Sequence, residues 1–211
     1  MPLNFPRRLG IIASLLTGLL GPAASAAPLA ADFSDAAYFG SGDFNNIGWS
    51  FSVTSTVTID GLGLFDYEAN GLANRHQVGL WDSSNQLIAQ ATVFNNNTTA
   101  LASASGAGQW LFVDIAALTL GAGDYVIGAF YEDNDLDAIA AIASGLMLDD
   151  HFSYGASRAS DGVSFETPGV YGLVQPGIFG PNLRVALPEP DMLGLLGLAL
   201  AGAAASRRRQ G

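Results

Sequence analysis

Alternation of apolar and polar residues with a period of two is the feature that most constrains the fold of this chain. Within residues 49–54 the apolar side chains are Trp49, Phe51 and Val53, and a Ser or Thr follows each of them. The alternation continues at Val57 and Ile59. Successive side chains of a β-strand point to opposite faces, so this pattern predicts strands with one buried and one solvent-facing side.

Further candidate strands follow along the chain, separated by turn residues. Asn70-Gly71 and residues 82–85 supply turn chemistry, because Asn and Gly readily adopt positive φ. Residues 136–148 fit either a short helix or a strand. Short strands without a long amphipathic helix predict an all-β fold, a single β-sandwich of the jelly-roll kind over residues 27–187. The other expected strands cover residues 62–67, 75–81, 86–94, 110–115, 118–120, 124–131, 147–154, 164–165, 170–174 and 182–187.

The C-terminal residues 188–211 differ in composition from the predicted sandwich. As a helix, the 14-residue uncharged run would extend roughly 21 Å, whereas a stable membrane span needs about 20 residues. This short apolar helix therefore predicts a transient anchor, and the arginines after it would stay in the cytoplasm. A permanent anchor and a buried core helix are the alternatives. The segment has three parts, in this order: Pro188, Glu189 and Pro190; the uncharged run over residues 192–205; and Arg207, Arg208 and Arg209.

The N-terminal residues 1–26 have the pattern of a secretory signal peptide. An arginine pair precedes an apolar run over residues 9–20, and Ala24 and Ala26 form a small-residue site for signal peptidase, with the cut after Ala26. A twin-arginine export signal is the alternative, but the residues expected around the arginine pair are missing. Both ends of the chain therefore predict that residues 27–187 are exported across the inner membrane.

The tail as a whole resembles a known sorting signal. The order of Pro-Glu-Pro, apolar run and arginine cluster over residues 187–211 is similar to the PEP-CTERM signal of exosortase-processed proteins in Gram-negative bacteria. The same tail is also known as the ice-binding protein C-terminal domain. The resemblance implies a membrane-embedded exosortase as processing partner and a cell-surface or extracellular location. An ice-binding face would need a flat array of regularly spaced threonines, which this sequence lacks.

A second resemblance concerns the predicted sandwich. Residues 62–66, 71–72, 76–82 and 123–129 are similar to a recurring ectodomain of exosortase-sorted proteins and to uncharacterised bacterial β-sandwich domains with a Leu-Trp turn motif. This resemblance implies a fold and an exported location, and it implies no activity.

Charge and cysteine content limit the partners of the exported domain. Of 8 basic and 19 acidic residues, three arginines and 17 carboxylates lie between the two end segments, which gives a net charge of about −14. Nucleic acid and anionic lipid are poor partners for such a surface. Because the chain has no cysteine, its stability must come from an apolar core, with a metal ion as a further possibility.

An acidic segment suggests one metal site. Asp133, Asp135 and Asp137 place carboxylates at alternate positions, as a calcium loop would. An EF-hand is excluded, because Ala138 and Ser144 stand where that loop needs Gly and Glu. A solvated acidic loop without metal is the interpretation that we favour, and calcium at the three aspartates is the alternative.

Nothing in the sequence predicts a catalytic site. His76 lies on the same predicted strand face as Val78 and Leu80, which favours a packed histidine over a ligand or base. No His-x-His zinc pattern, Gly-x-Ser-x-Gly motif or cysteine is present. Two carboxylates of a glycoside hydrolase could lie anywhere among the 17 acids, but we expect a protein that is not an enzyme.

The aromatic residues suggest a sugar-binding face. Trp81 lies beside a predicted turn and Tyr154 precedes Gly155, so these two rings are our candidates for exposed stacking platforms. Core packing is the expectation for the other aromatic residues. Three functions follow: a non-catalytic surface or matrix protein associated with exopolysaccharide or biofilm, which we favour; a carbohydrate-binding module, with or without calcium; and a secreted hydrolase.

Overall fold

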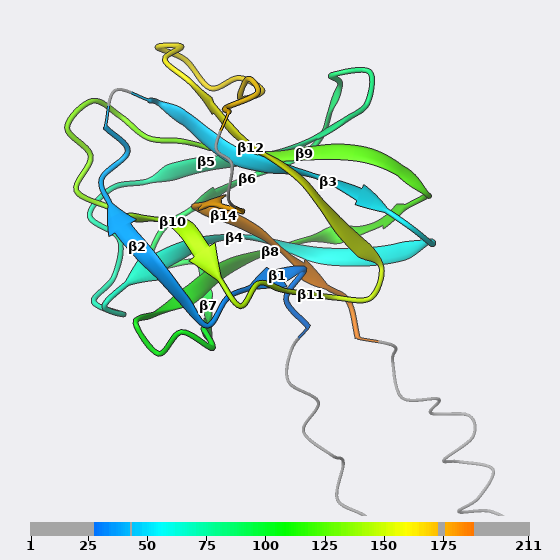
Figure 1. Cartoon of the computed structure of the whole chain (residues 1–211), viewed down its shortest axis with the longest axis horizontal. Helices are drawn as coiled ribbons and strands as arrows, with labels where there is room; N and C mark the ends of the chain where they lie inside the picture. The colour runs from blue at the N-terminus through cyan, green and yellow to red at the C-terminus, as the bar shows by residue number, and fades with distance from the viewer. Residues whose placement is uncertain (1–27, 43, 173–175, 188–211) are drawn as a thin grey trace, which may run out of the picture.

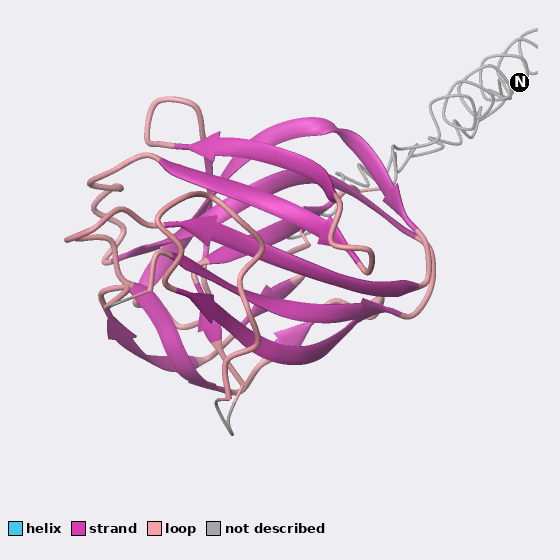
Figure 2. Cartoon of the chain, turned by 90° about the horizontal axis from the view of Figure 1, so that it is seen from above, coloured by secondary structure: helices cyan, strands magenta, loops and turns pink. Residues whose placement is uncertain are grey.

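The computed structural model of the protein describes residues 28–42, 44–172 and 176–187. These residues form only strands, turns and loops (Figures 1 and 2), which confirms the predicted all-β fold. No helix among them is long and apolar enough to cross a membrane. The predicted signal peptide and the predicted tail helix lie outside the described residues. The strands are β1 (Ala31–Asp32), β2 (Asp35–Phe39), β3 (Asn46–Val53), β4 (Val57–Tyr67), β5 (His76–Asp82), β6 (Leu87–Val93), β7 (Thr99–Ala102), β8 (Gly108–Leu120), β9 (Gly123–Phe130), β10 (Ile139–Ser144), β11 (Met147–Leu148), β12 (Phe152–Ser160), β13 (Ile178–Phe179) and β14 (Pro181–Val185).

Two antiparallel sheets pack face to face as a β-sandwich. One has five strands in the order β12-β3-β9-β5-β6, and the other has four in the order β14-β4-β8-β7. In Figure 1 the five-stranded sheet lies above the four-stranded one. The predicted sandwich is therefore confirmed, with neighbouring strands that come from distant parts of the chain.

Two smaller sheets complete the fold, with the orders β13-β10-β2 and β1-β11. Strand β10 falls in the stretch that the sequence left open between helix and strand. The sequence pattern did not predict β1 or β2, because neither shows clear alternation of apolar and polar residues.

The two ends of the described domain lie together. The Val185 amide donates to the Pro28 carbonyl at 2.9 Å, and the Ala30 amide donates to the Leu183 carbonyl at 2.9 Å. Leu29 also forms an antiparallel bridge with a residue of β14. The exported domain is therefore joined to both end segments at one edge of the four-stranded sheet.

The predicted alternation determines what the sandwich buries. Trp49, Phe51 and Val53 of β3 are buried in the core, whereas Ser50 and Ser52 lie on the opposite face of the sheet and line a surface groove. Burial of apolar area between the sheets supplies the main stabilising term in a protein without disulfides.

Aromatic rings form the centre of the core. The Phe33 ring lies 5.5, 5.9 and 5.7 Å from the rings of Phe65, Trp110 and Phe179, measured between centroids. The Trp110 indole N–H donates to Asp32 Oδ1 at 3.1 Å, so its polar atom is not left without a partner. Phe33 lies in the loop between β1 and β2, so this short N-terminal segment is part of the core.

In the turn after β4, positive φ occurs at other residues than the sequence predicted. Positive φ occurs at Glu68 (65°), Ala69 (53°) and Gly71 (92°), and Asn70 is not among the positive-φ residues. Both carboxylate oxygens of the buried Asp66 accept from the Gly71 amide at 3.1 Å. This local hydrogen bonding to the Asp66 side chain, rather than an Asn-Gly hairpin, shapes the turn.

Several strand predictions need correction. The two strands expected over residues 110–120 are one continuous strand, β8, whose pairing with β4 shifts register between Ile59 and Gly61. Residues 164–165 lie in a loop, and Val170 forms only an isolated bridge. Strand β7 was missed because its segment, Thr99–Ala102, is rich in small residues.

Close backbone contact between β3 and β9 requires glycine. A Cβ on Gly48 would lie 1.9 Å from the Ile127 carbonyl oxygen and 2.8 Å from the Gly128 Cα. A Cβ on Gly128 would lie 2.6 Å from Pro168 Cδ, so the loop that carries Pro168 also requires glycine at this position. No side chain can be added at these positions without moving a strand or a loop.

We therefore expect Gly48→Ala to destabilise the protein by about 3 kcal/mol, the upper end of the usual cost of overpacking. Gly121→Ala is the matched control, since a Cβ there has no neighbour within 4 Å. Urea unfolding of both variants measures the difference. Equal unfolding midpoints would contradict the close approach of β3 and β9.

Candidate functional site

The three aspartates of the predicted calcium loop do not converge. Asp133 is exposed, and its Oδ1 accepts from the Asn45 side-chain amide at 3.0 Å. Asp135 and Asp137 are buried and turn toward His76 instead. Among the described residues, the cluster with metal-ligating side chains is His76, Asp135 and Asp137, and Asp133 is not part of it.

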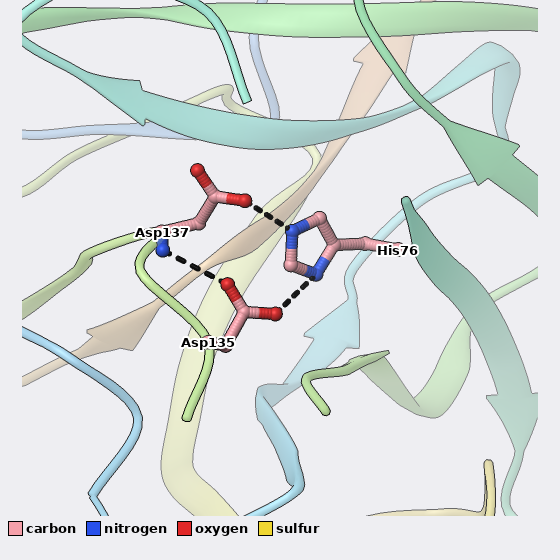
Figure 3. Close-up of side chains that lie close together, drawn as sticks. All are labelled: His76, Asp135 and Asp137. Carbon is pink, nitrogen blue, oxygen red and sulfur yellow. Dashed lines mark hydrogen bonds and ion pairs between the residues drawn. The ribbon is translucent and has the colours of Figure 1, made fainter. Parts of the chain in front are cut away.

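His76 joins strand β5 to the acidic loop that follows β9 (Figure 3). Its ring Nε2 lies 2.8 Å from Asp137 Oδ2, and its Nδ1 lies 3.1 Å from the Phe130 carbonyl oxygen and 3.8 Å from Asp135 Oδ2. The imidazole is completely buried. The predicted burial of His76 is confirmed, but the sequence did not indicate its acidic partners.

Asp137 is held by donors from two sides. The amides of Ala73 and Asn74 donate to its two carboxylate oxygens at 2.8 and 3.0 Å, and His76 contacts one of the same oxygens. Burial by itself would raise the pKa of Asp137, but these hydrogen bonds and the imidazole together hold its pKa below the ordinary value. Asp137 is therefore a carboxylate at neutral pH and anchors the loop to the segment before β5.

Two buried oxygens beside His76 have no hydrogen-bond partner among the described residues. They are Asp135 Oδ2 and the Tyr131 hydroxyl. The Tyr131 ring packs against His76, with ring centroids 4.6 Å apart. Burial, reinforced by the negative charges of Asp135 and Asp137, raises the pKa of Tyr131 well above its usual value. Orphaned buried oxygens are rare in proteins, so this cluster is chemically unusual.

The prediction of an exposed Trp81 is wrong. Trp81 is only 4% exposed, and its ring packs against Phe165 with centroids 5.2 Å apart. The loop that carries Phe165 folds over the outer face of the five-stranded sheet, because the buried Asn46 bonds to the backbone of residues 162, 164 and 166. Trp81 therefore anchors a loop and offers no stacking platform.

Tyr154 lies on a different face from Trp81. It is half-buried, its ring stacks on Trp49 of the core at 6.4 Å, and its hydroxyl contacts Ser157 Oγ at 2.9 Å and accepts from the Gly177 amide at 3.1 Å. The two aromatic candidates do not form one sugar-binding surface. His151, the second histidine, is paired with Asp149 at 2.6 Å, and the two do not join the His76 cluster.

A polar groove of about 380 Å³ runs across the outer face of the five-stranded sheet. Its walls include hydroxyl, amide and carboxylate groups from β3, from the turn after β5 and from the start of β9. Such groups hydrogen-bond to polar ligands, and the volume lies in the range of small-molecule sites. The polar side chains that line the groove include Ser50, Ser52, Asp82, Asn85, Asp124 and Arg158.

Arg158 is the cation of this groove. Among the described residues, no carboxylate lies within 4 Å of it, and its buried Nε has no hydrogen-bond partner. The other two arginines of the domain are engaged elsewhere. Arg184 bridges Asp60 and Asp114 across the four-stranded sheet, and Arg75 lies over the Phe94 ring. The sequence did not single out Arg158, because its strand gives no sign of which face forms a groove.

We expect Tyr131→Phe to leave the free energy of unfolding unchanged or raise it by about 1 kcal/mol, because it removes a buried hydroxyl without a partner. In the wild type, the unfolded chain ionises this tyrosine at lower pH than the native state does. The wild type should therefore lose stability as the pH rises above 10, and the variant should lose less stability over the same pH range.

Tyr154→Phe provides the contrast. It removes a hydroxyl that has two partners, and it should cost about 1 kcal/mol at neutral pH. Chemical denaturation at pH 7 and pH 10.5 measures both variants. An equal loss of unfolding free energy in the two variants at pH 7 would show that the Tyr131 hydroxyl has a hydrogen-bond partner.

Comparisons with known proteins bear on the tail. A protein-family model, the PEP-CTERM protein-sorting motif, matches residues 186–209. No curated protein and no solved structure matches the chain significantly. The match includes the residues expected to carry the signal, Pro188, Glu189, Pro190, Arg207, Arg208 and Arg209, which lie outside the described residues, as do Ala24 and Ala26 of the predicted signal-peptidase site. The chain therefore carries a PEP-CTERM protein-sorting motif, which indicates an exported protein that an exosortase processes and that is sorted to the cell envelope or surface.

Proposed function

We propose that this protein is a non-catalytic component of the cell surface or extracellular matrix, retained together with exopolysaccharide after its tail has been processed. The sorting motif carries the proposal. Export would take the chain across the inner membrane of a Gram-negative bacterium, with signal peptidase acting at the N-terminus and the tail serving as a transient membrane anchor. The sandwich is then the part that functions outside the cell.

The position of the motif relative to the fold supports this sequence of events. The last strand, β14, ends at Val185, and Pro188 to Pro190 follow directly. A cut at or beyond the Pro-Glu-Pro sequence leaves both sheets of the sandwich in the product. Because Pro28 and Val185 are hydrogen-bonded to each other, the domain is attached to both end segments at one edge of the four-stranded sheet. The outer face of the five-stranded sheet belongs to the other layer of the sandwich.

The surroundings of the histidines support a non-catalytic role. His76 is completely buried and faces two carboxylates and a carbonyl, so a substrate in solvent would not reach it. His151 pairs with Asp149 two residues away. In the described part of the chain, neither ring is hydrogen-bonded to a serine or threonine hydroxyl that could act as a nucleophile.

We expect replacement of Pro188, Glu189 and Pro190 by alanine to block tail processing. The variant should remain in the inner-membrane fraction with an intact tail, whereas the wild type should be released to the surface in a shortened form. Cell fractionation with mass spectrometry of the C-terminus measures this. Normal shortening and release of the variant would refute exosortase processing at this sequence.

A carbohydrate-binding function is the second candidate, and the groove that contains Arg158 favours it. Serine hydroxyls, an asparagine amide and two carboxylates on one sheet face match the hydroxyl groups of a saccharide. Because the domain carries a net charge of about −14, a neutral polysaccharide fits better than an acidic one. Trp81 contributes no exposed ring, so hydrogen bonds rather than aromatic stacking would carry recognition.

We expect Arg158→Ala to weaken binding to a neutral exopolysaccharide at least tenfold, because it removes the guanidinium donor that lines the groove. Arg75→Ala is the matched control, since it makes the same change of charge at an exposed position away from the groove. Affinity electrophoresis in gels that contain the polysaccharide measures the difference. Equal retardation of both variants and the wild type would leave only the matrix role of the sorted protein.

A further inference from the structure

The imidazole of His76 is oriented by Asp137. A carboxylate only accepts hydrogen bonds, so the 2.8 Å contact between His76 Nε2 and Asp137 Oδ2 places a hydrogen on Nε2. In the neutral imidazole the other ring nitrogen, Nδ1, then carries a lone pair. A carboxylate that orients a ligating histidine in this way is a common feature of zinc sites.

The atoms around Nδ1 are also acceptors. The Phe130 carbonyl oxygen lies 3.1 Å from Nδ1. Asp135 Oδ2 lies 3.8 Å from the same nitrogen, as Figure 3 shows. The Asp135 side chain is 0% exposed, and its Oδ2 has no hydrogen-bond partner among the described residues. Two electron-pair donors therefore lie within 3.8 Å of Nδ1, and a neutral ring with its hydrogen on Nε2 has none to place between Nδ1 and either oxygen.

The charges around this point are not balanced. Asp137 receives hydrogen bonds from two backbone amides and faces His76, whereas Asp135 receives only the Asp137 amide, on its other oxygen. Among the described residues, no arginine lies within 4 Å of either carboxylate. Buried carboxylates without a cationic side chain beside them are costly, and a divalent cation would offset that cost.

We propose that the cluster binds a divalent transition-metal ion of the zinc type through His76 Nδ1, Asp135 Oδ2 and the Phe130 carbonyl oxygen, with Asp137 as the positioning residue behind the imidazole. Ligands about 2.1 Å from a tetrahedral ion lie about 3.4 Å apart. The separations of 3.1 and 3.8 Å lie within a few tenths of an ångström of this value.

The ligand set distinguishes this site from the calcium site predicted by the sequence. Calcium takes six to eight oxygen ligands, whereas the imidazole nitrogen in this cluster is a ligand that suits zinc and related transition-metal ions. Exposed Asp133, which the calcium loop would need, is not in the cluster. A bound ion would tie the loop after β9 to β5 in a protein that has no disulfide.

The test uses the full chain, purified in detergent without a polyhistidine tag and stripped with a chelator. We expect Zn²⁺ and Co²⁺ to bind with one-to-one stoichiometry in calorimetry and to raise the unfolding midpoint by at least about 4 °C at a hundredfold excess over Kd. Co²⁺ should give the visible absorption bands of a four-coordinate ion with a nitrogen ligand. The proposal would be overturned if neither Zn²⁺ nor Co²⁺ bound, or if Ca²⁺ alone raised the unfolding midpoint.

Two variants of equal charge change locate the site. Asp135→Asn should weaken Zn²⁺ binding at least tenfold, whereas Asp133→Asn, in the same loop but exposed, should leave the affinity unchanged. Circular dichroism checks that both variants fold. If Asp135→Asn does not fold, X-ray absorption of the wild-type zinc complex decides, and a first shell without an imidazole nitrogen refutes the site. Equal weakening in both variants also refutes it.

Discussion

Hydrogen bonds between loop backbone and buried side-chain amides or carboxylates hold the candidate functional surfaces of this protein in place. Asn46 is completely buried and bonds to the backbone at three points between residues 162 and 166. Asn182, also completely buried, binds both the amide and the carbonyl of Ala31. Such satisfied polar groups select one loop conformation, because each would be costly to leave unpaired. In a chain without disulfides they serve in place of covalent links.

These hydrogen bonds to loop backbone have opposite effects at the two candidate sites. The loop held by Asn46 covers Trp81 and so removes an aromatic ring from the surface, while the groove beside it keeps Arg158 without an ion-pair partner among the described residues. The loop after β9 is held by Asn45 at Asp133 and by His76 at Asp137. In that loop the hydrogen bonds keep charged side chains in the interior. A polar groove on one face and a charged cluster in the interior are therefore both consequences of how the loops are fixed.

The fold was more accessible to prediction from the sequence than the site. Alternation at Trp49, Phe51 and Val53 predicted a buried strand face, because strand periodicity is local. The Asp-x-Asp spacing at Asp135 and Asp137 marked the right loop. It did not show that His76, 61 residues before Asp137, would be the partner, since that contact depends on the pairing of β5 with β9. A signal was present only in the scarcity of histidine, with two in the chain.

The sequence by itself determined that this protein is an all-β, strongly acidic domain between two end segments, and that its tail carries the residues of a sorting motif. These properties depend on residue type and short-range spacing. Only the tertiary structure decided that Trp81 is buried, that Arg158 lies in a groove and that the Phe130 carbonyl, Asp135 and Asp137 surround one imidazole. The physical reason is that exposure and proximity depend on sheet order, register and the course of loops between distant strands, which no local pattern records.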